Sequence, residues 1–202
     1  ITRRPQEGHQ QQVYVEGGNH DYSDVGASAL GSVGDFDYTV ELASRDDGEP
    51  TPGSTRKSDS ANVRLGWQPS ARQELSISYR YLDGKRSSYP EQSGGPEYAL
   101  FDALDDSDYT QDIFGFGWGT QLAPIWRSTV TASRFEQEEH YRSPGISPYF
   151  EVPPNGADTD FTRDQIRWIN TLQLASDYEA NIGAEYRHED GKSKGYIEYF
   201  GD

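Results

Sequence analysis

The stretch ANVRLGWQPSARQELSISYRYLD, residues 61–83, decides the fold because its side chains alternate with a period of two. Apolar residues occupy every second position on both sides of a polar break at residues 68–72: Val63, Leu65 and Trp67, then Leu75, Ile77, Tyr79 and Tyr81. Polar residues fill the positions between them. Successive side chains of a strand point to opposite faces, so this stretch predicts a β-hairpin with one apolar and one polar face.

The same alternation recurs along the chain and predicts about nine strands of roughly ten residues each, with almost no helix. The connections near Gly34, Pro69, Pro124 and Asp177 are short. Polar segments rich in Gly, Pro or Ser predict long loops at 46–60, 84–108, 137–160 and 188–202. Short and long connections alternate, so we expect all long loops at one end of the sheet; the turn near His20, at that same end, is brief.

This arrangement predicts an all-β fold, an antiparallel up-and-down segment of a transmembrane β-barrel. Aromatic residues near the expected strand ends resemble the girdles found at membrane interfaces: Trp67, Tyr79, Tyr81, Trp118, Trp126, Trp168, Tyr178 and Tyr186. Residues 127–136 read as a strand, but small side chains on both sets of positions leave its two faces unassigned. Two alternatives stay open: a small self-contained porin-like barrel, and a soluble lipocalin-like binding barrel with its apolar face inward.

Composition narrows the functional classes. The 202 residues carry a net charge of -16, and 33% are hydrophobic while 13% are aromatic. This is too aromatic for a disordered chain and too poor in aliphatic residues for a large core. The acidic balance argues against nucleic acid as a partner. Without cysteine, and with four scattered histidines, the chain shows no catalytic constellation, so we expect no enzyme.

Three stretches resemble TonB-dependent outer-membrane receptors. ITRRPQEG, residues 1–8, resembles the end of the plug domain in that family, and VYVEGGNHDYSDVGASALGSVGDFDYTVELASRDDG, residues 13–48, resembles its first three barrel strands. The order of strands and loops is similar to the cobalamin-transporter branch. FTRDQIRWINTLQLASDYEANIGAEYRHEDGKSKGYIEYFGD, residues 161–202, looks like the eighth and ninth strands of that branch and the loop that follows.

The resemblance implies a plug–barrel junction at residues 1–8 and a partial barrel at residues 9–202, in a plugged barrel of about 22 strands. It implies a bacterial outer-membrane location and import of a scarce nutrient such as a corrinoid or a ferric siderophore. The implied partners are outer-membrane lipid, a plug domain, further barrel strands and a periplasmic TonB protein. About nine strands cannot close such a barrel, so we expect these residues not to fold independently.

The expected loops hold two sets of candidate site residues. Exposed aromatics above a rigid barrel are candidate ligand contacts, although they can equally pack against one another: Tyr89, Tyr98, Phe101, Tyr141, Tyr149 and Phe150. Carboxylates in flexible loops suit calcium, and the resemblance to cobalamin receptors implies that calcium can bind here. The alternative is that these carboxylates are solvated loop tips. The candidate residues are Asp46, Asp47, Asp102, Asp105, Asp106 and Asp108. No other cofactor is expected. The alternating Gly115, Gly117 and Gly119 are expected to leave room for a plug.

Overall fold

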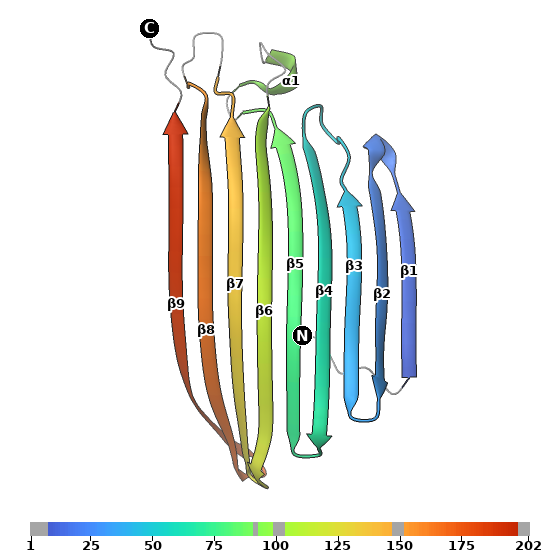
Figure 1. The fold of residues 1–202 in the computed structure, drawn as a ribbon, viewed down its shortest axis with the longest axis vertical. Coiled ribbons are helices and arrows are strands. Elements are labelled where there is room, and N and C mark those ends of the chain that lie inside the picture. Colours follow the sequence, from blue (N-terminus) through green and yellow to red (C-terminus); the bar gives the residue numbers. More distant parts are fainter. Residues whose placement is uncertain (1–7, 91–92, 99–103, 147–151, 198–202) are drawn as a thin grey trace.

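The computed structural model describes residues 8–90, 93–98, 104–146 and 152–197, which form one antiparallel sheet of nine strands in sequence order (Figure 1). The strands are β1 (Gly8–Gly17), β2 (Ser23–Val33), β3 (Phe36–Asp46), β4 (Thr55–Ser70), β5 (Gln73–Ser88), β6 (Asp105–Ala123), β7 (Trp126–Ser143), β8 (Asn155–Ala175) and β9 (Tyr178–Ile197). The described helices are a 3-10 turn, η1 (Asn19–Asp21), and one turn of α-helix, α1 (Gly95–Tyr98). The predicted all-β, up-and-down fold is therefore confirmed.

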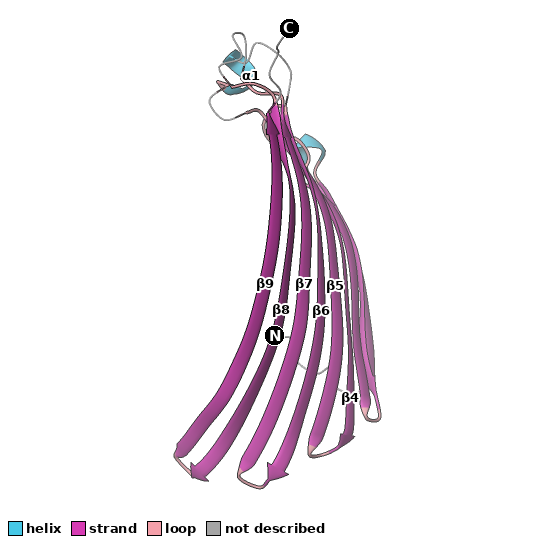
Figure 2. Ribbon diagram, turned by 60° about the vertical axis from the view of Figure 1, so that its left-hand side comes forward, coloured by secondary structure: helices cyan, strands magenta, loops and turns pink. Residues whose placement is uncertain are grey.

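The two ends of the sheet differ as the sequence predicts. Two-residue turns join β2 to β3, β4 to β5, β6 to β7 and β8 to β9 at the lower end of Figure 1. The longer connections, residues 47–54, 89–104 and 144–154, lie at the upper end, together with the brief turn around η1. We call this upper end the outer rim. Seen from the side, the sheet is a single curved layer (Figure 2).

The strands are longer, and the loops shorter, than the sequence predicts. Strands β4 to β9 contain 16 to 21 residues and extend into the expected loops 46–60, 84–108 and 137–160. Residues 188–197, expected to be a loop, belong to β9. The extensions are polar on both faces, so they carry no hydrophobic alternation, yet their backbone groups still pair across strands. At the other terminus β1 begins at Gly8, and residues 1–7 lie outside the described part.

One face of the sheet is apolar across its whole width. The strand register aligns a row of mostly apolar side chains from β3 to β9: Tyr38, Leu65, Ile77, Phe116, Ala132, Ile166 and Tyr186. This row, the row below it and, from β3 to β6, the row above it define the apolar face. Leu65 is 54% exposed and Ile77 is 47% exposed, and no described hydrophobic residue is buried. A soluble barrel would bury such residues in a core, so the structure does not favour the lipocalin-like alternative.

The register also settles the faces of β7, which the sequence leaves unassigned. Trp126, Val130 and Ala132 lie on the apolar face, and the alternate residues between them lie on the opposite, polar face. The indole of Trp126 donates a hydrogen bond to the Asn170 side chain, with an Nε1–Oδ1 distance of 2.9 Å. On β8, the Trp168 indole likewise donates to Ser128 Oγ at 2.8 Å. These tryptophans expose apolar rings while their N–H groups stay paired with side chains of the neighbouring strand.

The polar face is held together by side chains that cross between strands. Arg64 pairs with Asp37, and Arg167 pairs with Glu185 at 2.7 Å. A Cβ atom on Gly117 would lie 2.7 Å from Ser76 Oγ. A side chain of the neighbouring strand therefore occupies the space beside this glycine. That these glycines leave room for a plug stays a prediction.

The outer rim contains one tight contact between neighbouring connections. Gly48 has a φ of 67°, and a Cβ atom there would overlap the carbonyl oxygen of His20. The same oxygen accepts a hydrogen bond from the Glu49 amide at 2.8 Å. The connection at residues 47–54 therefore rests directly on the turn between β1 and β2.

We expect Gly48→Ala to destabilise the intact protein by about 1–3 kcal/mol more than Gly34→Ala, because only the first substitution creates a clash. Gly34 is a matched control, since its φ is also positive at 57° but nothing lies within 4 Å of its Cβ position. Urea unfolding gives the difference, and hydrogen exchange at the Glu49 amide reports the contact. Equal protection of that amide in both variants would contradict this account.

Candidate ligand-binding surface on the polar face and outer rim

The predicted aromatic contacts occupy different environments. Tyr98 ends α1 and is 75% exposed. Tyr89 follows β5, and its ring and the Leu104 side chain lie against Gly53, where a Cβ atom would be 2.7 Å from the ring. Tyr89 therefore contacts the connection between β3 and β4. The remaining loop aromatics, Phe101, Tyr149 and Phe150, lie outside the described residues.

The sequence predicts that Tyr141 lies in a loop. In the structure it lies instead on the polar face of β7. Its hydroxyl donates a hydrogen bond to Asp105 Oδ2 at 3.0 Å, and burial raises the pKa of its phenol. Beside it, Arg86 Nη2 and Ser107 Oγ both donate to one carboxylate oxygen of Glu139, each at 2.8 Å. Because both faces of this segment are polar, its alternation could not reveal that it is a strand.

The acidic residues at the end of β3 and directly after it are paired with basic side chains. Asp46 lies 2.7 Å from Lys57 Nζ and Asp47 lies 2.6 Å from Arg45 Nε. The hydrogen bond from Lys57 lowers the pKa of Asp46. The contact therefore contributes stability above the ordinary carboxyl pKa and loses it as the pH falls through the lowered value.

The acidic residues at the start of β6 point to both faces. Asp105 lies on the polar face, whereas Asp106 and Asp108 lie on the opposite side, with Asp108 3.5 Å from Lys85 Nζ. Asp102 lies outside the described residues. Within the described ranges no three His, Asp or Glu side chains are grouped as a metal site would need. Calcium binding stays a prediction.

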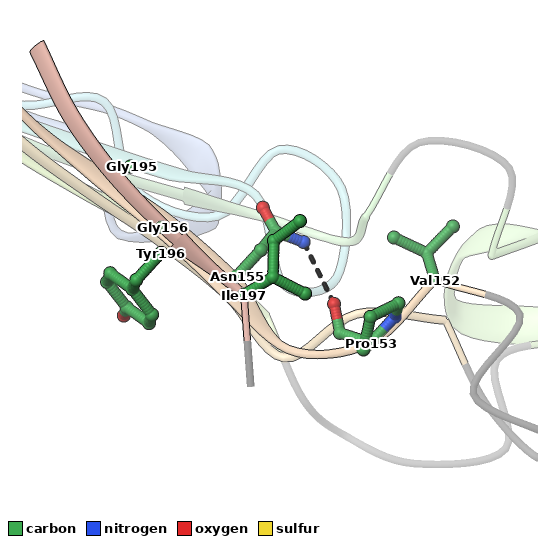
Figure 3. A pocket seen from close by; sticks show the side chains of 7 residues that line it. All are labelled: Val152, Pro153, Asn155, Gly156, Gly195, Tyr196 and Ile197. Atoms are coloured by element: carbon green, nitrogen blue, oxygen red, sulfur yellow. Dashed lines mark hydrogen bonds between the residues drawn. The ribbon is translucent and has the colours of Figure 1, made fainter. Parts of the chain in front are cut away.

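A hollow of about 690 Å³ opens at the outer rim between β8, β9 and the connection before β8 (Figure 3). Its lining is largely apolar: Val152, Pro153, Asn155, Gly156, Gly195, Tyr196 and Ile197. The Tyr196 ring lies over Gly156, where a Cβ atom would be 2.6 Å from it, and Asn155 Nδ2 donates to the Pro153 carbonyl at 3.0 Å. This size is typical of small-molecule sites. The sequence does not predict this hollow, because its residues fall in segments that are expected to be loops.

A second surface crosses the polar face in a single register row from β3 to β9. Its members are Glu41, Asn62, Arg80, Ile113, Phe135, Arg163 and Glu189, which we call the arginine row. A hollow of about 650 Å³ beside it includes Asn62, Arg80 and Ile113 in its lining. Apolar residues at polar-face positions, Ile113 and Phe135, are the signal in the sequence that could have revealed this surface.

A tilted pair of aromatic rings marks one part of the arginine row. The rings of Phe135 and Phe161 lie 5.9 Å apart, and the Arg163 guanidinium lies 5.5 Å from the centre of the Phe135 ring. Arg163 also lies 3.9 Å from Glu189. The polar face thus combines half-buried rings and guanidinium groups, which suits ligands that carry both negative charge and flat apolar surface.

These features define the class of fold: a curved antiparallel meander with an apolar and a polar face, as in the wall of a large receptor barrel. The sheet is similar to the crystal structure of the siderophore receptor PiuA from Acinetobacter baumannii, with a TM-score of 0.73 over 96% of this chain and 14% sequence identity. The match covers 32% of that receptor, so this chain spans about a third of its length. At this identity the likeness concerns the fold.

Two other comparisons give no match. No protein-family model matches this sequence, and no curated protein matches it. Among the described residues, no helix has the length and apolar character needed to cross a membrane.

Proposed function

We propose that this chain forms part of the barrel of a TonB-dependent outer-membrane receptor that imports a scarce nutrient. The observation that carries the proposal is the sheet itself, with an exposed apolar face, a polar opposite face and no buried hydrophobic residue among those described. In a membrane the apolar face would contact lipid, and strand pairing would satisfy the backbone. The longer connections would then lie together at one surface.

A ferric siderophore is the favoured cargo, and a corrinoid is the second candidate. The structural likeness to a siderophore receptor supports the first and gives no support to the cobalamin-transporter branch that the sequence resembles. The plug domain and the segment that engages TonB would belong to other parts of the receptor. The proposal assigns this chain a transport role and no catalytic one.

The small self-contained barrel is not favoured. In the described part of the chain, β1 and β9 are the two edges of the sheet, and each pairs with a single neighbour. Closing a barrel would require these edges to meet. In lipid, each unpaired backbone group costs several kcal/mol, so further strands are needed on both sides.

Uptake of labelled iron tests the proposed function. The intact protein would be produced in a bacterium that lacks its own siderophore receptors, with and without the TonB protein. We expect the protein in the outer-membrane fraction and TonB-dependent uptake of at least one ferric chelate. Recovery as a soluble protein without detergent, or uptake that is the same without TonB, would refute the proposal.

A further inference from the structure

Cationic side chains are sorted between the two faces of strands β4 to β9. The chain's lysines all lie on the same side as the apolar face, in the polar extensions above it: Lys57, Lys85, Lys192 and Lys194. Most arginines of these strands lie on the polar face: Arg56, Arg64, Arg80, Arg86, Arg127, Arg163, Arg167 and Arg187. Arg134 and Arg142 of β7 lie on the other side. Guanidinium groups bind planar anions in a fixed, forked geometry that ammonium groups lack.

Most polar-face arginines are already neutralised by a carboxylate, and Arg80 is an exception. Arg64 pairs with Asp37, and Arg86 with Glu139 at 2.8 Å. Arg80 forms no ion pair with any residue in the described ranges and is exposed at the hollow of about 650 Å³. Glu41, an acidic residue of the arginine row, lies two strands from Arg80, which is roughly 10 Å at ordinary strand spacing.

The aromatic rings in and near the arginine row are also unusual for a polar face. Phe135 lies two strands from Arg80, again roughly 10 Å, and its ring contacts the tilted Phe161 ring and the Arg163 guanidinium. Along β6, by contrast, the next three polar-face residues beyond Ile113 are glycines. Half-buried rings within about 10 Å of an unpaired cation favour a molecule that has both an anionic group and a flat apolar surface.

We infer that the arginine row binds an anionic aromatic chelate, with Arg80 contacting its negative charge and Phe135 and Phe161 its rings. This inference rests on the proposed function and deepens it, because it selects an aryl iron chelate over a neutral corrinoid. The hollow next to Arg80 falls within the roughly 300–1,000 Å³ of small-ligand sites.

Calorimetric titration of the intact protein in detergent micelles tests the inference with three probes. They are the ferric complex of 2,3-dihydroxybenzoate, which is anionic and aromatic, ferric acetohydroxamate, which is neutral and ring-free, and cyanocobalamin. We expect the first to bind most tightly. Arg80→Gln should weaken it by about 10-fold or more, the usual effect of losing a charged hydrogen bond. Lys85→Gln, on the other face of β5, should change it by less than about twofold.

A second variant addresses the rings. Phe135→Leu should weaken the aromatic chelate by about three- to tenfold and leave ferric citrate, an anionic chelate without rings, unaffected. Thermal unfolding of each variant shows whether the fold is kept.

The possible failures are distinguishable. If Arg80→Gln weakens the neutral and anionic chelates equally, Arg80 supports the fold and the inference is wrong. If cyanocobalamin or ferric acetohydroxamate binds more tightly than the anionic aromatic chelate, the inference fails while the proposed function stands. If none of the three probes binds and no iron uptake occurs, both fail.

Discussion

Val130→Arg is expected to lower the free energy of unfolding of the intact protein in lipid vesicles by about 1–4 kcal/mol, the cost of arginine on the lipid face of a barrel, which rises from the interfaces to the bilayer midplane. Val130 lies on the apolar face of β7, with Trp118 and Trp168 as its cross-strand neighbours. None of these neighbours carries a charge that could pair with the new guanidinium. The cost should be visible in denaturant-dependent unfolding from vesicles.

Ser133→Arg is the matched control on the same strand. Ser133 lies on the polar face between Gly115 and Gln165, where the side chain can remain hydrated. We expect a change below about 1 kcal/mol there, as for surface substitutions. Equal costs at the two positions, or a larger cost at Ser133, would mean that the faces are assigned the wrong way round.

The 202-residue chain on its own is expected to show no cooperative unfolding transition in water. Ordinary domains owe about 5–15 kcal/mol of net stability to burial in a core, whereas the described part of this chain buries no hydrophobic residue. Both edge strands also present unpaired backbone groups, which favour aggregation over folding. Circular dichroism and tryptophan fluorescence during urea titration should change gradually and at different concentrations.

Placing the same chain in detergent micelles is the control. Micelles cover the apolar face, so secondary structure should increase, although the edges remain unpaired. A single sigmoidal transition in water, coincident for both probes, would show that the sheet is an independent folding unit and would refute this expectation.

The sequence predicts this fold well wherever one face of a strand must be apolar. Residues 61–67 and 74–81 alternate regularly on either side of the turn, and the structure pairs Leu65 with Ile77 across the predicted hairpin. The distribution of long and short connections is also readable, because turn residues mark every reversal. Both signals come from local chemistry that does not depend on distant contacts.

The sequence does not reveal strands in which neither face needs to be apolar. The outer halves of β5 to β9 are polar on both sides, so residues such as Tyr141 and Tyr196 read as loop residues although they lie in strands. The faces of β7 were ambiguous because Ser128, although polar, lies on the apolar face, where it accepts the Trp168 indole hydrogen bond. That pairing depends on register, which composition cannot reveal.

The candidate site depends on register even more strongly. Arg80, Phe135 and Arg163 are far apart in sequence and meet only because four strands align them in one row. The predicted loop aromatics and carboxylates were chosen for exposure and chemistry alone. The described ones proved to be scattered or paired with neighbouring side chains, as Asp46 is with Lys57.

Spin-label accessibility along β7 tests the central claim most directly. The chain has no cysteine, so single cysteine substitutions at residues 126–133 of the intact protein in lipid vesicles each give one nitroxide site. We predict that collisions with oxygen, which concentrates in lipid, peak at the even positions, and collisions with a water-soluble nickel chelate peak at the odd ones. Two profiles that rise and fall together, or nickel access at every position, would contradict a sheet with one face toward lipid and the other toward water.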